Sequence, residues 1–328
     1  MKQFCFAAAL CVASFSTAVA AAPSPVETNG ALSVKGTHLV NQQGKAIALA
    51  GPSFFWSNTG WGQEKFYNAS AVKSFVTDWN ASVVRAAMGV DAKGGWIDDR
   101  ANEARVEALV DAAIANGAYV IIDWHSHHAE QHTDEALAFF KRMATKYGHT
   151  PNVIYELYNE PLREASWSKT IKPYAEKLIA GIRAIDPDNI ILVGTPTWSQ
   201  DVDVAVADPL VGKNLMYVLH FYAGTHKQDL RDKADAAMRK GAPLFVSEWG
   251  SVNADGNGGV SAGETALWQA YLRKNCLSQA QWAASDRDEG ASVFKPGTSG
   301  TGPWTDGDLT PSGRLLRDIL KNWTVACE

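Results

Sequence analysis

The sequence predicts an α/β fold, a single-domain (β/α)8 TIM barrel with a short N-terminal β-hairpin that caps the barrel bottom. Apolar strand-like runs alternate with helix-like segments along the chain, a pattern typical of parallel strands joined by crossover helices. Eight such runs occur, which is the number of strands in this barrel. Polar and ionisable residues gather at the C-terminal ends of the runs, where such a barrel builds its active site. A doubly wound open sheet is the alternative fold.

The predicted hairpin comes first, over residues 32–49, and turns at Gln43 and Gly44. The strands follow as short apolar runs. In chain order they are 47–55, 82–88, 119–125, 152–160, 190–195, 215–222, 243–249 and 278–285. Most of the intervening segments carry apolar residues at helical spacing, often with a cap such as Thr133 or Gly117. These predicted helices are 101–117, 133–148, 167–186, 229–241 and 263–275, with a short helix near 202–207.

The N-terminal residues 1–22 have the pattern of a secretory signal peptide. A single lysine is followed by an apolar run and then by small residues, with an A-x-A type site between Ala20 and Ala22. The apolar run is shorter than the roughly 20 residues that a spanning helix needs, which disfavours a retained membrane anchor. We therefore expect a secreted or periplasmic protein whose residues 23–328 form one barrel domain, with no linker and no repeated module.

Composition and charge narrow the class of ligand. The chain is 46% hydrophobic and 20% charged, as expected of a globular protein. Its net charge is −5, and −6 without the signal peptide, which argues against nucleic acid and favours a neutral substrate. We also expect a monomer. In an oxidising compartment Cys276 and Cys327 are expected to pair, adding roughly 4 kcal/mol on the chain-entropy estimate; two free buried thiols are the alternative.

Two glutamates in the run "VIYELYNEP" raise the central question about function. Burying an unpaired carboxylate costs several kcal/mol, so each of the two needs a reason. Glu160 ends the fourth strand, and Glu248 ends the seventh, so the two carboxylates would face each other across the barrel mouth. Two carboxylates that flank a glycosidic bond are what glycoside hydrolysis requires. Glu156 lies roughly 13 Å deeper along the strand, and we expect it to pair with a cation, Arg85 being the first candidate.

Other strand-end residues suit the same site. Asn159 is expected to hold a sugar hydroxyl, and His220 and Tyr222 to hydrogen-bond the carboxylates. Arg85 would keep Glu248 ionised. Flat aromatic side chains stack on the apolar faces of pyranose rings, and the tryptophans at strand ends are the best candidates. These are Trp56, Trp61, Trp198 and Trp282, whereas Trp79, Trp268 and Trp323 lie in helix patterns and are expected in the core.

The segments "VIYELYNEP" and "PLFVSEWG" resemble glycoside hydrolase family 5, a group of retaining β-glycanases on a (β/α)8 barrel. Further segments, among them "VVRAAMG", "IIDWHSH" and "LHFYAGTH", are similar to the bacterial endoglucanase (cellulase) branch. All eight positions that the family holds at its site are matched, by Arg85, His125, Asn159, Glu160, His220, Tyr222, Glu248 and Trp282.

The resemblance implies that Glu160 is the general acid/base and Glu248 the nucleophile. It places Trp198, Arg287 and Glu289 on the glycone side of the bound chain. Three departures from the family pattern, Gln279, Ala283 and Arg287 (where lysine is usual), bear on substrate preference alone. The expected function is a secreted endo-β-1,4-glucanase that acts on a cellulose-type β-glucan with retention of configuration and without a metal or other cofactor.

Several alternatives remain at this point. Within the same class, mannan or mixed-linkage glucan competes with cellulose as the substrate. His125 and His127 have the spacing of a metal pair in barrel amidohydrolases. The loop 253–264 carries Asp255 and Glu264 at a spacing reminiscent of a calcium loop, although a substrate-side loop explains it better. A non-catalytic carbohydrate-binding protein would keep the aromatic residues but has no need of two opposed glutamates.

Overall fold

The computed structural model describes residue 1 and residues 23–327. The predicted signal peptide lies outside the described residues, apart from Met1. Within the described part of the chain, no helix is both long and apolar enough to cross a membrane.

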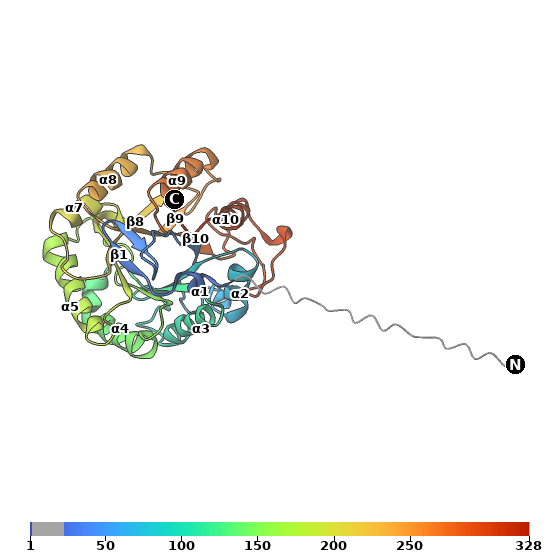
Figure 1. The fold of residues 1–328 in the computed structure, drawn as a ribbon, viewed down its shortest axis with the longest axis horizontal. Coiled ribbons are helices and arrows are strands. Elements are labelled where there is room, and N and C mark those ends of the chain that lie inside the picture. Colours follow the sequence, from blue (N-terminus) through green and yellow to red (C-terminus); the bar gives the residue numbers. More distant parts are fainter. Residues whose placement is uncertain (2–22, 328) are drawn as a thin grey trace.

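Eight parallel strands close into a barrel, in the order β10-β3-β4-β5-β6-β7-β8-β9, which confirms the predicted fold. Every barrel strand is buried along its whole length, as expected where helices cover the outside of a sheet. Figure 1 shows these helices arranged around the sheet. The strands are β3 (Ala50–Phe54), β4 (Val83–Gly89), β5 (Tyr119–His125), β6 (Val153–Glu156), β7 (Ile190–Val193), β8 (Leu215–Tyr222), β9 (Leu244–Gly250) and β10 (Gln279–Ala284).

The outer layer contains the predicted helices and two that the sequence analysis did not assign. The predicted ones are α3 (Ala101–Ala115), α4 (Thr133–Tyr147), α5 (Lys172–Arg183), α7 (Val202–Ala207), α8 (Gln228–Arg239) and α9 (Ala262–Lys274). The two others are α2 (Ala69–Thr77) and α10 (Pro311–Lys321). Both begin at a side-chain cap, since Asn68 accepts from Ala71 and Thr310 accepts from Gly313. Short turns of helix are α1 (Pro25–Asn29), α6 (Pro196–Ser199), η1 (Glu64–Phe66), η2 (Ala129–His132), η3 (Trp167–Ile171) and η4 (Asp306–Asp308).

The N-terminal hairpin caps the barrel bottom as predicted, but its turn differs. Strands β1 (Ser33–Lys35) and β2 (His38–Val40) pair antiparallel around a turn at Gly36, whose φ of +62° suits glycine. The predicted turn at Gln43 and Gly44 is a second one, closed by a bridge between Val40 and Ala46. Apolar side chains from this region pack into the lower barrel. They are Leu32, Leu39 and Ile47, in contact with a cluster that includes Val83, Tyr119, Ile154, Ile190 and Phe245.

Near the C-terminus, Cys327 is held close to the N-terminal part of the barrel. Cys276 and Cys327 form the expected disulfide. The backbone N–H of Cys327 donates to the carbonyl of Ala46, just before the barrel begins. The bridge therefore fixes Cys327 beside the segment that leads into β10, and the hydrogen bond fixes it beside the segment that enters β3.

The fourth barrel strand is shorter than predicted. We expected a strand over 152–160, but β6 ends at Glu156, and the chain leaves the sheet before it reaches Asn159 and Glu160. Glu156 is therefore the strand-end residue, and Glu160 lies on the loop above it. This difference decides how Glu160 is held, because a loop residue lacks the ladder of hydrogen bonds that positions a strand.

Candidate active site

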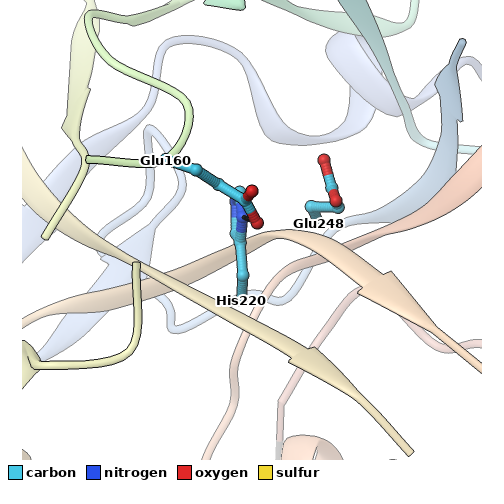
Figure 2. A group of neighbouring side chains, drawn as sticks. All are labelled: Glu160, His220 and Glu248. Carbon is cyan, nitrogen blue, oxygen red and sulfur yellow. Dashed lines mark hydrogen bonds and ion pairs between the residues drawn. The ribbon is translucent and has the colours of Figure 1, made fainter. Parts of the chain in front are cut away.

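Two carboxylates face each other at the C-terminal end of the barrel. Glu160 follows β6, and Glu248 lies on β9. One carboxylate oxygen of each and a ring nitrogen of His220 all lie within 4.8 Å of one another. Figure 2 shows the Glu160 carboxylate extending toward Glu248, with the imidazole of His220 close to it. The two glutamates are thus near enough to act on the two ends of one bond.

A fully buried arginine, Arg85 on β4, connects the residues beneath this pair. Its Nε and Nη2 donate to Glu156 at 2.8 and 3.1 Å, which confirms the predicted partner of that carboxylate. Its Nη1 donates to Glu248 at 2.9 Å, and its Nη2 also donates to Asn159 at 2.8 Å and lies 2.9 Å from Asp123. The guanidinium of Arg85 therefore holds several side-chain oxygens in place, which the backbone hydrogen bonds of the sheet do not position.

Glu248 is held by two donors and is almost completely buried. The hydroxyl of Tyr222 donates to its Oε1 at 2.7 Å, and Arg85 occupies its Oε2. Burial raises the pKa of Glu248, and the nearby Glu160 adds to this, whereas His220, Arg85 and Tyr222 lower it. The donors thus oppose desolvation and favour the ionised form, which is the form that a nucleophile requires.

His220 on β8 links Glu160 to the buried network. Its Nδ1 lies 3.0 Å from Glu160, and its Nε2 lies 3.0 Å from the hydroxyl of Ser247. That hydroxyl donates to Glu156 at 2.8 Å, so it must accept from Nε2–H. Burial lowers the pKa of His220, but the nearby carboxylates of Glu156 and Glu160 outweigh it and raise the pKa to about 9. Below that pH the protonated ring therefore donates its Nδ1–H to Glu160.

The same contacts argue against a metal at this cluster. Glu160, His220 and Glu248 are the only group of three potential ligands close enough to hold an ion within residues 23–327. Both ring nitrogens of His220 already bond protein oxygens, so neither lone pair is available without losing those bonds.

The alternative metal pair of His125 and His127 is not supported either, because neither residue belongs to a group of three close potential ligands within residues 23–327. His125 directs its Nδ1 to Asp123 at 2.7 Å, while His127 directs its Nδ1 to the carbonyl of Glu160 at 3.2 Å. Burial lowers the pKa of His125 well below its usual value, which favours the neutral ring. In the loop 253–264, whose spacing was reminiscent of a calcium loop, Glu264 pairs with Arg231.

Two hollows lie on either side of Glu160. The first, of about 230 Å³, is named here the Trp282 hollow, and the second, of about 360 Å³, the Trp198 hollow. Glu160 and Tyr222 line both, whereas Glu248 lines only the Trp282 hollow. The other residues of the Trp282 hollow are Phe55, Trp56, His125, His127, Asn159, Ala254, Asp255, Gly256, Trp282 and Glu289. Those of the Trp198 hollow are Arg163, Thr197, Trp198, Gln200, His220, His226 and Ala254.

The predicted aromatic residues differ in their surroundings. Trp282 stacks on His125 with ring centroids 5.1 Å apart and planes 4° apart, and Trp56 meets His125 edge-on at 4.2 Å. Trp198 is 39% exposed in its hollow. Trp61 packs on Trp56, at 5.8 Å, and lines neither hollow.

One predicted grouping is wrong. Trp198, Arg287 and Glu289 were expected together on the glycone side, but Trp198 and Glu289 line different hollows. Arg287 lies over the ring of Phe55 at 5.2 Å and 3.4 Å from Glu289, so it belongs with the Trp282 hollow. The sequence did not predict that Trp198 and Glu289 line different hollows, because their separation depends on the conformation of the loop after β7.

Comparison with known proteins identifies the family. The model of the cellulase family, glycosyl hydrolase family 5, matches residues 40–288. The chain belongs to glycosyl hydrolase family 5.

Similar proteins support the assignment to family 5. The chain is 55% identical to endoglucanase Z of Dickeya dadantii (strain 3937), over 89% of this chain and 66% of that protein. It is 43% identical to an endoglucanase of Clostridium saccharobutylicum, over 89% of this chain and 65% of that protein. It thus spans about two thirds of the length of these relatives.

Similar solved structures share the fold over nearly their whole length. A structure from Cytophaga hutchinsonii has a TM-score of 0.89 and 49% identity, covering 91% of this chain and 97% of that one. The catalytic domain of Thermobifida fusca endoglucanase Cel5A has a TM-score of 0.86 and 32% identity, covering 92% of this chain and all of that one. A variant of that domain was solved in complex with cellotetraose.

The family 5 site also contains residues that the sequence analysis did not select. The hydroxyl of Ser247 links His220 to Glu156 through two hydrogen bonds. Its position directly before Glu248 is the one sequence signal for it. Thr197 and His226 line the Trp198 hollow from two loops. Gln279, one of the family departures, pairs with Gln269 through two amide hydrogen bonds and lines neither hollow.

Proposed function

We propose that this chain is a secreted, monomeric endo-β-1,4-glucanase that hydrolyses cellulose-type β-glucan with retention of configuration and without a metal. The observation that carries the proposal is the opposed pair of carboxylates within 4.8 Å, with a hollow on each side. Retaining glycosidases place their carboxyl groups about 5 to 5.5 Å apart, whereas inverting enzymes leave about 6.5 to 9.5 Å for a water molecule. The names of the similar endoglucanases support the substrate class.

In the first step, the ionised Glu248 attacks the anomeric carbon while the bond to the leaving oxygen breaks. Glu160 donates its proton to that oxygen. His220 lies 3.0 Å from Glu160 and, while its ring is protonated, can pass the Nδ1 proton to that carboxylate. Arg85 and Tyr222 keep the attacking carboxylate ionised and aimed until the covalent bond forms.

In the second step, Glu160 acts as a base. It takes a proton from water, whose oxygen attacks the anomeric carbon and releases Glu248 as a carboxylate. Two inversions at one carbon restore the starting configuration. The sugar that is attacked would sit in the Trp282 hollow, because Glu248 lines only that one, and the leaving sugar would sit in the Trp198 hollow.

A polysaccharide panel with the product anomer read by NMR tests this proposal. We expect hydrolysis of soluble cellulose in preference to mannan and mixed-linkage glucan, with the β-anomer formed first. An α-anomer as the first product would overturn retention, and a preference for mannan or mixed-linkage glucan would reassign the substrate. Unchanged hydrolysis in Glu160→Gln and Glu248→Gln would exclude these residues as the catalytic pair, and binding of the polysaccharide without any hydrolysis by the unsubstituted protein would leave a carbohydrate-binding protein as the better explanation.

A further inference from the structure

The loop after β7 contains three consecutive residues in the left-handed backbone region. Thr197, Trp198 and Ser199 have φ angles of 59°, 54° and 56°. Residues other than glycine avoid this region, and the β-branched Thr197 is unfavourable there. Such backbone persists where surrounding contacts hold it, and it concentrates at functional sites. The contacts of this left-handed turn, residues 197–199, therefore indicate what it is for.

The left-handed turn bonds the carbonyl groups of the two residues that flank Glu160. The hydroxyl of Ser199 donates to the carbonyl of Asn159 at 2.8 Å and accepts from the N–H of Thr195 at 3.3 Å. The N–H of Trp198 donates to the carbonyl of Pro161 at 2.9 Å. Ser199 is completely buried, so water does not compete for its hydroxyl.

Glu160 has few other backbone restraints. Strand β6 ends at Glu156, so no sheet ladder reaches Glu160, and Pro161 has no N–H to offer. Its own N–H donates to the carbonyl of Ser126 at 3.3 Å, and its carbonyl accepts from His127 at 3.2 Å. The two bonds from the left-handed turn are shorter than either, which makes the turn the tighter support of this loop.

The left-handed turn also carries the aromatic wall of the neighbouring hollow. Trp198 bonds Pro161 through its backbone, while its exposed side chain lines the same hollow as Glu160. The left-handed turn would thus position both a sugar stacked on Trp198 and the carboxyl group of Glu160.

We infer that Ser199 is a positioning residue for Glu160, and that the left-handed turn aligns the general acid with the oxygen of the leaving sugar in the Trp198 hollow. The inference rests on the proposed glucanase function. It assigns Ser199 no contact with substrate, since its hydroxyl is used by Asn159 and Thr195. The consequence is specific, because a misplaced acid slows only those reactions whose leaving group needs a proton.

Aryl β-cellobiosides with leaving phenols of graded acidity provide the test. In Ser199→Ala we expect kcat/KM to fall about tenfold for the least acidic phenols, as loss of one buried hydrogen bond allows, and less than twofold for the most acidic. Glu160→Gln should show the same trend with a larger amplitude. Ser199→Gly also removes the hydroxyl but tolerates the left-handed backbone, so it should behave like Ser199→Ala and serves if the alanine variant is poorly folded.

Ser82→Ala is the matched control. Ser82 is buried and lies directly before β4, at the barrel bottom. Its hydroxyl donates to the carbonyl of Ala50, on β3, at 3.2 Å. We expect a lower Tm in this variant and an unchanged dependence on the leaving group. An equal loss for all phenols in both Ser199 variants, or a loss of Tm alone, would overturn the positioning role while leaving the glucanase proposal intact. Failure of the unsubstituted protein to hydrolyse either aryl cellobiosides or soluble cellulose would overturn both.

Discussion

Arg85 and Glu156 form a buried ion pair with two hydrogen bonds, 2.8 and 3.1 Å long, directly below the opposed carboxylates. Neither side chain is exposed to solvent. The same guanidinium reaches Glu248, so the pair links the interior of the barrel to the residue proposed as the nucleophile. Breaking such a pair from one side leaves a buried charge without its partner, which is among the more costly changes to a folded protein.

The first prediction distinguishes the structural role of Glu156 from the catalytic role proposed for Glu160. Glu156→Gln should lower the free energy of unfolding by about 3 to 5 kcal/mol, because it leaves Arg85 incompletely paired. Glu160→Gln should leave stability within about 0.5 kcal/mol but lower kcat by about 100-fold or more on cellulose. Chemical denaturation and steady-state kinetics measure the two effects. Comparable stability of the two variants would contradict this division.

The second prediction concerns the pH profile of kcat/KM. Because the pKa of Glu248 is raised, the acid limb should lie above the usual value for a glutamate, 4.5, and the alkaline limb should lie near pH 9, where His220 loses its proton. Tyr222→Phe removes a donor to Glu248 and should move the acid limb up by about one pH unit. An unmoved acid limb in this variant would exclude Glu248 as the group that titrates.

The third prediction concerns stability rather than rate. The pKa of His220 is raised to about 9 in the folded protein, above its ordinary 6.5. Folding therefore favours the protonated ring, and this stabilisation is fully present below pH 6.5 and is lost as the pH rises through about 9. The Tm difference between the protein and His220→Gln should shrink over this interval by an amount equivalent to a few kcal/mol. A difference that stays constant from about pH 6 to about pH 10 would show that the ring is not charged.

The fourth prediction addresses the Trp198 hollow. Trp198→Ala should reduce transfer to added sugar acceptors relative to hydrolysis by about tenfold, because an acceptor must bind where the leaving sugar was. Trp198→Phe retains a flat ring and should keep most of the transfer. Product ratios from cello-oligosaccharides measure the effect. Equal transfer in the alanine variant and the unsubstituted protein would place the acceptor elsewhere.

The fifth prediction concerns the disulfide. Cys276 and Cys327 are 51 residues apart, and closing a loop of this length contributes about 4 kcal/mol on the chain-entropy estimate. The double variant Cys276→Ala/Cys327→Ala should unfold at a correspondingly lower denaturant concentration. In the presence of a reductant the two proteins should unfold at similar concentrations. A gap that persists after reduction would assign the stability to packing at these sites instead of to the bridge.

Much of the fold and the central chemistry were predictable because they depend on local patterns. Alternation of buried strands with amphipathic helices is a property of neighbouring residues, and it led to the closed barrel. The barrel then brings strand ends together, which is why Arg85, His220 and Glu248 could be placed around one mouth before any distance was known. The pairing of Arg85 with Glu156 followed from the cost of burying a carboxylate alone.

Tertiary structure decided what no local pattern encodes. The end of β6 at Glu156, the separation of Trp198 from Glu289 and the relay through Ser247 all depend on contacts between segments far apart in sequence. The left-handed turn at Thr197 to Ser199 is the clearest case, since its residues individually disfavour that backbone. Hydrogen bonds to the carbonyl groups of Asn159 and Pro161, on another loop, help to hold the conformation. The sequence by itself determined the barrel and its pair of glutamates, and long-range hydrogen bonding decided how the loops hold them.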